Sequence, residues 1–203
     1  MILSISIILA IIVVNFAPRY IKNEENNLIS TCNEIELDRV YSKNYALGAI
    51  LIASPQILLT FLPIGLLYQC VFLMLGIASY FDFKRNWIPD PVIFITSIVN
   101  FLYILNSHEL SFKVVCINAF IFTLPYAVLN ALSYVFHRKL IFYSGDIYII
   151  ISLSFSVLPI IGIITNSLSL FMALLFMLVT KKREIPYIPF LFASFLTSSV
   201  LMS

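Results

Sequence analysis

Residues 45–81 contain no formally charged side chain. This stretch is too long for one membrane helix, which needs about 20 mostly apolar residues, and Pro63 and Gly65 offer a turn inside it. The whole chain is similarly apolar, because 61% of its 203 residues are hydrophobic and 11% are charged. Soluble domains carry roughly 25% charged residues. A water-soluble fold of this size could not bury so much apolar surface, so the sequence predicts an integral membrane protein with the lipid bilayer as its solvent.

Apolar runs separated by polar residues or proline predict an all-α, polytopic transmembrane bundle of about eight helices. We expect the helices at about 2–17, 45–62, 64–81, 91–106, 113–135, 147–165, 167–180 and from about 187 to the C-terminus. The expected organisation is a first transmembrane helix at 1–17, a short cytoplasmic segment at 18–44 and a seven-helix membrane domain at 45–203.

The basic residues indicate how this expected bundle is oriented. Eleven of the twelve lysines and arginines fall on one side of it, and only Lys113 falls on the other. Because an excess of Lys and Arg marks the cytoplasmic face of membrane proteins, we expect both chain termini to lie outside. The net charge of +2 and the lack of a basic stripe argue against a nucleic-acid partner.

Two aspartates stand at the cytoplasmic edge of expected helices, Asp82 at the end of the third and Asp146 at the start of the sixth. Ionisable groups near a span are costly and are therefore functional candidates. Each also has a structural explanation, since Asp146 could cap its helix and Asp82 could pair with Lys84 or Arg85 in a wet loop. Two carboxyl groups held close would instead share a proton, one taking a proton from water and the other donating to a peptide carbonyl.

Other chemistries have weaker support in the sequence. Cys32, Cys70 and Cys116 stand far apart, without a C-x-x-C pair, which disfavours a zinc site or a disulfide framework. His108 and His137 are each isolated, and no H-E-x-x-H occurs, which disfavours a membrane metalloprotease. The expected chemistry of the aspartate pair therefore needs no metal and no cofactor.

Three segments resemble the signatures of the type IV prepilin peptidases, a family of membrane aspartyl proteases. Asp82, followed after five residues by Ile88-Pro89, resembles the first signature. Residues 143–146, Tyr-Ser-Gly-Asp, resemble the second, G-x-G-D. Residues 185–190, Ile-Pro-Tyr-Ile-Pro-Phe, resemble a proline-rich stretch near the family's C-terminus. The resemblance covers about residues 45–203.

This resemblance implies an aspartic endopeptidase of the bacterial cytoplasmic (inner) membrane with Asp82 and Asp146 as its catalytic residues. Its implied substrate is a type IV prepilin or pseudopilin, whose basic leader would be removed at the cytoplasmic face. The chain departs from the family pattern at Tyr143, which replaces the first motif glycine, and at Tyr148, where the family often has lysine.

The family often carries a cytoplasmic domain with paired C-x-x-C motifs, and many members also methylate the new N-terminus with S-adenosylmethionine. Here the corresponding segment, 18–44, is short and holds only Cys32. The resemblance therefore implies a minimal member that cleaves without methylation.

Two other functions stay open on the sequence alone. The aspartates could form a proton relay in a small transporter, with polar residues lining a path across the bundle. The residues available for such a path are Asn118, Asn130, Ser133, Ser152, Ser154 and Ser156. Serine and asparagine also join helices in membranes, so these residues equally fit a packing role. The third possibility is a non-catalytic scaffold for pilus assembly.

Overall fold

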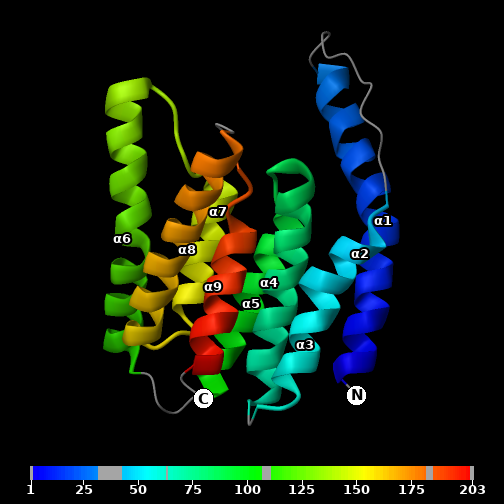
Figure 1. Cartoon of the computed structure of the whole chain (residues 1–203), viewed down its shortest axis with the longest axis horizontal. Coiled ribbons are helices and arrows are strands. Elements are labelled where there is room, and N and C mark those ends of the chain that lie inside the picture. Colours follow the sequence, from blue (N-terminus) through cyan, green and yellow to red (C-terminus); the bar gives the residue numbers. More distant parts are fainter. Residues whose placement is uncertain (1, 32–42, 63, 107–110, 182–184, 202–203) are drawn as a thin grey trace.

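The computed structural model describes residues 2–31, 43–62, 64–106, 111–181 and 185–201. Within these ranges the chain forms helices joined by short connections, without a strand, and its helices form one bundle (Figure 1), which confirms the predicted all-α fold. The elements are α1 (Ile2–Thr31), α2 (Tyr45–Gly48), the π-helix η1 (Ala49–Ala53), α3 (Ser54–Leu59), α4 (Leu66–Arg85), α5 (Asp90–Asn106), α6 (Phe112–His137), α7 (Ser144–Ser154), α8 (Pro159–Thr180) and α9 (Ile188–Leu201). Because α2, η1 and α3 form one continuous segment, eight helical segments result.

Four of the described helices are long and apolar enough to cross a membrane. The spans are Leu3–Glu24, Leu66–Arg85, Lys113–Phe136 and Pro159–Thr180. The other apolar segments are shorter, at Tyr45–Leu59, Asp90–Asn106, Ser144–Ser154 and Ile188–Leu201. Many large apolar side chains, among them Phe61, Phe94 and Val179, lie exposed on the outside of the bundle. Large apolar exposure of this kind suits lipid better than water, so these features together indicate a membrane protein.

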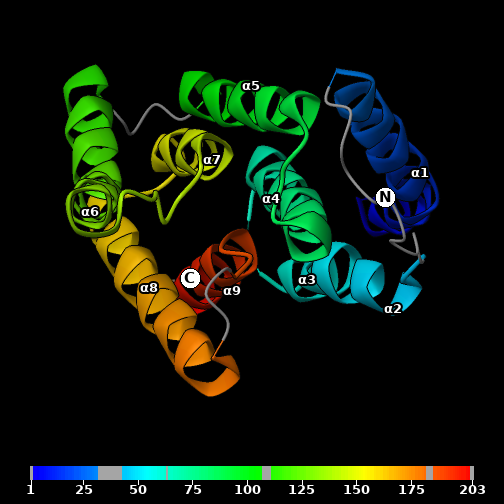
Figure 2. The same cartoon turned by 90° about the horizontal axis from the view of Figure 1, so that it is seen from above.

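The bundle is built around α4, which packs against α5 on one side, α9 on another and the α2–α3 segment on a third (Figure 2). Helix α7 packs between α5 and α6, and α8 runs along α9. The main core lies between these helices and contains Phe72, Phe122, Tyr126 and Phe195, all fully buried. A second core joins α1 to α2 and α4. Helix α1 begins and α9 ends at the same end of the bundle (Figure 1).

Several helix boundaries differ from the sequence expectation. Helix α1 continues to Thr31 rather than stopping near residue 17, because the polar residues after Pro18 include good helix formers such as Lys and Glu. Helix α7 stops at Ser154 rather than near 165, and Pro159 opens α8 at a helix start that suits proline. The side-chain amide of Asn118 donates to the carbonyls of Ser154 and Val157, which stabilises the break between α7 and α8.

Helix α4 ends one turn later than expected. Its C-terminal cap is Asn86, whose φ of 51° is in the left-handed region that asparagine tolerates better than most residues. Asp82 therefore lies in the last turn of α4, and the chain leaves the helix just before Ile88 and Pro89.

Glycine at position 76 allows the closest approach between helices α4 and η1. A Cβ there would lie 2.3 Å from the backbone oxygen of Leu51, and a backbone atom cannot rotate away. We expect Gly76→Ala to destabilise the protein by about 2 kcal/mol, as overpacking typically does. The matched control is Gly65→Ala, because nothing lies within 4 Å of a Cβ at Gly65. Thermal unfolding in detergent measures both variants, and equal midpoints would contradict the close approach.

Candidate active site

Asp82 is buried at the end of α4, with 3% of its surface exposed. The backbone N–H of Ile188, the first residue of α9, donates a hydrogen bond of 2.8 Å to its Oδ2. The N–H of Tyr187 also donates to this carboxyl group. The alternative of a solvated Asp82 in a wet loop is therefore wrong, because backbone donors of a distant helix start hold the side chain inside the bundle.

Asp146 lies in the first turn of α7 and is 9% exposed. Its Oδ2 accepts a hydrogen bond of 3.0 Å from the backbone N–H of Tyr143, the residue that caps the helix. Asp146 thus stabilises the start of α7, although from within the first turn and not as the N-cap residue that the sequence suggested. This capping bond occupies one carboxylate oxygen.

The structure brings the two sequence motifs together. A Cβ at Gly145 would lie 4.0 Å from the Cβ of Ile88 and 3.6 Å from Cδ1 of Ile93, so the start of α7 packs directly on the segment that follows Asp82. The carboxyl groups of Asp82 and Asp146 are close enough to interact electrostatically. The end of α4, which carries Asp82, and the start of α7, which carries Asp146, lie at the same end of the bundle, opposite the end where α1 begins and α9 ends.

Tyr187 anchors the third segment of the site, the turn that leads into α9. Its hydroxyl lies 2.5 Å from that of Tyr126 and 2.6 Å from that of Ser169, and Tyr126 in turn donates to Asn166. The ring packs on Phe142, with centroids 4.9 Å apart. Burial holds the pKa of Tyr187 well above its usual range, so the hydroxyl stays protonated. These contacts fix the backbone whose N–H groups bind Asp82.

Asn130 anchors the linker that leads to Asp146. Its Oδ1 accepts hydrogen bonds from the N–H groups of Ile141 and Phe142, and its amide donates to the carbonyl of Phe142. Sequence reasoning placed Asn130 among candidates for a polar path or for helix packing and gave Tyr187 no separate role. The sequence signal for Asn130 was a polar side chain in an apolar helix. Such a side chain is expected to have a hydrogen-bond partner, but the sequence does not show which residue supplies it.

The two departures from the motif pattern do not strain the backbone. Tyr143 has φ −79° and ψ 167°, an extended conformation that any residue adopts, so this loop does not require glycine there. Tyr148 is 58% exposed on the outer face of α7.

The two cysteines in the described part of the chain do not join this site. Cys70 and Cys116 are free thiols on α4 and α6. Cys32, His108 and the side chain of His137 lie outside the described part of the chain. Within the described ranges, no group of three His, Cys, Asp or Glu residues could hold a metal ion.

The fold and site together define a helical membrane bundle with two buried, interacting carboxyl groups at one end. Comparisons with family models, with curated proteins and with solved structures found no match. A function is therefore inferred from the residues of this chain.

Removing the hydroxyl of Tyr187 tests the anchor of the α9 turn. We expect Tyr187→Phe to lower the free energy of unfolding by about 1–3 kcal/mol, because the buried hydroxyls of Tyr126 and Ser169 lose a hydrogen-bond partner. Tyr134→Phe is the matched control, since Tyr134 is half-exposed on α6. Urea or thermal unfolding in detergent measures the difference, and an unchanged Tyr187→Phe protein would show that the hydroxyl does not anchor the turn.

Proposed function

We propose that this chain is a membrane aspartyl endopeptidase that removes the basic leader from type IV prepilin or pseudopilin-like substrates, without methylating the new N-terminus. The observation that carries this proposal is the convergence of Asp82 and Asp146, with Ile88 of the first motif packed on Gly145 of the second. Two buried carboxyl groups 64 positions apart along the chain would have no reason to lie at the same end of the bundle, with their motifs packed together, if each only capped or solubilised its own helix.

The proposed chemistry is hydrolysis by a carboxyl pair. One carboxylate accepts a proton from water, whose oxygen attacks the carbonyl carbon of the scissile peptide bond. The other, protonated carboxyl group donates its proton to the carbonyl oxygen. Collapse of the tetrahedral intermediate then breaks the C–N bond: the leaving amine takes the proton that the first carboxylate received from water, and the hydroxyl formed on the carbonyl oxygen returns its proton to the second carboxylate. Two close carboxyl groups suit this division of labour because they resist ionising together.

The placement of charge supports action at the cytoplasmic face of a bacterial inner membrane. Basic residues lie in the last turn of α4 and directly after α6 and α8, at the same end of the bundle as the two aspartates: Lys84, Arg85, Arg138, Lys139 and Lys181. By the positive-inside rule this end is cytoplasmic. By resemblance to the family, the substrate has a basic leader in the cytoplasm, followed by an apolar helix in the membrane. The scissile bond between them would lie at the same depth as Asp82 and Asp146.

The polar residues that a proton-coupled transporter would need have other partners here. Asn118 donates to backbone carbonyls at the end of α7, and Asn130 holds the linker before it. Ser154 and Ser156 donate to backbone carbonyls of their own helix region. These bonds satisfy the backbone where helices end, which favours the peptidase over a proton path.

The test is cleavage of a co-expressed prepilin-type substrate with a basic leader, a glycine at the cleavage point and an apolar helix behind it. Leader removal, read by mass spectrometry of the product N-terminus, supports the proposal, and an unmethylated N-terminus supports the minimal activity. Proton-coupled uptake without cleavage would support the transporter instead. Pilus assembly that survives replacement of both aspartates would support a scaffold.

A further inference from the structure

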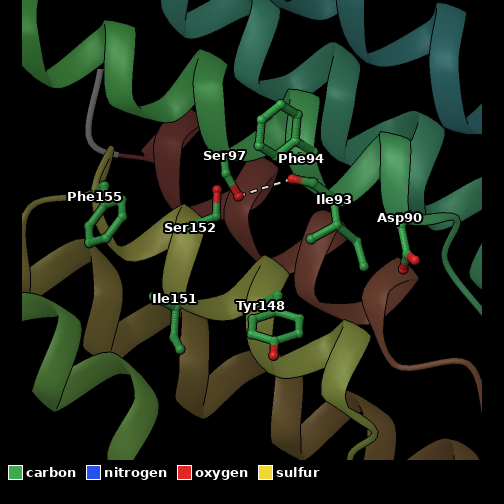
Figure 3. A pocket seen from close by; sticks show the side chains of 8 residues that line it. All are labelled: Asp90, Ile93, Phe94, Ser97, Tyr148, Ile151, Ser152 and Phe155. Carbon is green, nitrogen blue, oxygen red and sulfur yellow. Dashed lines mark hydrogen bonds between the residues drawn. The ribbon is translucent and has the colours of Figure 1, made fainter.

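An apolar groove runs between α5 and α7, next to the candidate active site (Figure 3). Its volume is about 360 Å³, and it is lined by Asp90, Ile93, Phe94 and Ser97 from α5, by Tyr148, Ile151 and Ser152 from α7, and by Phe155, the C-cap of α7. Asp90 lies at one end and Phe155 at the other, with Ser97 and Ser152 facing each other between them.

The lining residues repeat with the period of a helix on both walls. Each wall uses four positions spaced 0, 3, 4 and 7 along its helix, so each presents one straight stripe about 10 Å long. The small side chains of Ser97 and Ser152 would let the backbone of another helix approach closely. Their hydroxyls are already satisfied, because Ser97 donates to the carbonyl of Ile93 and Ser152 accepts from Asn100. An apolar occupant therefore leaves none of these groups without a partner.

The Asp90 end of the groove lies at the end of the bundle where α7 begins and where Asp146 stands. Ile93, on the groove wall, contacts the position where Gly145 precedes Asp146. Asp90 follows directly after the Ile88-Pro89 segment that packs on Gly145. An occupant that lies along the groove with its end at Asp90 would thus place its next residues beside the candidate catalytic groups.

We propose that this groove binds the apolar helix of the substrate, with the N-terminal end of that helix, and the basic residues before it, at Asp90. The proposal rests on the proposed function and adds where the substrate docks. A helix fits better than a lipid chain because Asp90 is exposed and negative. It attracts the positive end of a helix dipole and lysine side chains, whereas it repels the phosphate of a lipid headgroup.

The test measures binding without cleavage. The probe is a biotinylated peptide of three lysines followed by a 20-residue Leu/Ala helix, mixed with the full chain in phosphatidylcholine vesicles. A photoreactive benzoylphenylalanine replaces either Phe94, on the groove rim, or Ile95, which is exposed on the opposite face of α5. We expect the photoprobe at position 94 to form about ten-fold more adduct than the photoprobe at position 95. This ratio corresponds to a ten-fold higher occupancy of the groove than of the opposite face of α5.

Two further variants test shape and charge in the Phe94 photoprobe protein. Ser97→Trp fills the groove and should lower the adduct about ten-fold, while Ile95→Trp should leave it unchanged. Asp90→Lys should lower the adduct of the lysine peptide about five-fold and raise that of a matching glutamate peptide, because a partly exposed charge pair is worth up to about 1 kcal/mol.

Equal adducts at both photoprobe positions, or no exchange of preference in Asp90→Lys, would overturn the docking proposal. So would a photoreactive phospholipid that labels Phe94 and is not displaced by the peptide. Because the peptide has no cleavage site, these results are independent of the peptidase. If Ser97→Trp leaves leader cleavage unchanged, the docking proposal is wrong and the peptidase proposal stands. If the peptide binds specifically but the protein cleaves no leader, the docking proposal stands and the peptidase proposal is wrong.

Discussion

Replacing Asp82 or Asp146 with asparagine is expected to lower the rate of leader cleavage on the order of 10⁴-fold or more, as loss of one member of a cooperating catalytic unit does. An amide can neither take a proton from water nor donate the proton of a carboxylic acid. It is nearly the same size, however, and its oxygen still accepts the N–H of Ile188 at position 82 or of Tyr143 at position 146. The fold should therefore persist while the chemistry stops.

The measurement is the fraction of co-expressed substrate that loses its leader, compared at equal amounts of enzyme in the membrane. Glu24→Gln is the matched control, because it makes the same carboxyl-to-amide change at the C-terminal residue of the first candidate membrane span, and this variant should cleave normally. Thermal unfolding midpoints near that of the unchanged protein establish that the variants fold. The double variant should be no slower than either single one. Near-normal cleavage by either single variant would remove the carboxyl pair as the catalytic group.

Most of the fold was predictable because lipid imposes a simple rule on sequence. Apolar runs of helix length, separated by charges, located most helix starts and ends to within a few residues. The rule failed at the break after α7, because residues 155–165 are as apolar as the helices around them. The break is marked by Pro159, which starts α8, and by the amide of Asn118 on another helix, which binds the carbonyl of Ser154 at the end of α7. A long-range partner of this kind leaves no mark in the local pattern.

The candidate site was predictable in its residue types and not in its geometry. Asp82 and Asp146 stood out as rare charges, and their neighbours Ile88 and Gly145 marked two motifs. Their contact depends on how α4, α5 and α7 pack, which spacing along the chain does not state. The role of Tyr187 was hidden for a further reason. The groups that hold Asp82 are backbone N–H groups, and every residue except proline supplies one.

Because proline has no backbone N–H, a proline substitution at position 188 should also have a large effect on leader cleavage. Ile188→Pro removes the N–H that donates to Asp82 and leaves the carboxyl group in place. A hydrogen bond to a charged group contributes about 1.5–3 kcal/mol, so we expect leader cleavage to fall roughly 10- to 100-fold. Ile188 is the first residue of α9, where proline fits the helix, and its N–H points to Asp82 and not to a helix carbonyl. The helix should therefore start as before.

Ile188→Ala separates the lost hydrogen bond from the lost side chain. Ile188 is fully buried, so both substitutions remove packing and both should lower stability. Only proline also removes the donor. If the N–H of Ile188 holds Asp82 in its working orientation, the alanine variant cleaves much faster than the proline variant at temperatures where both are folded. Equal rates would mean that Asp82 keeps its position without this bond, and that the turn into α9 contributes packing but no orientation to the carboxyl pair.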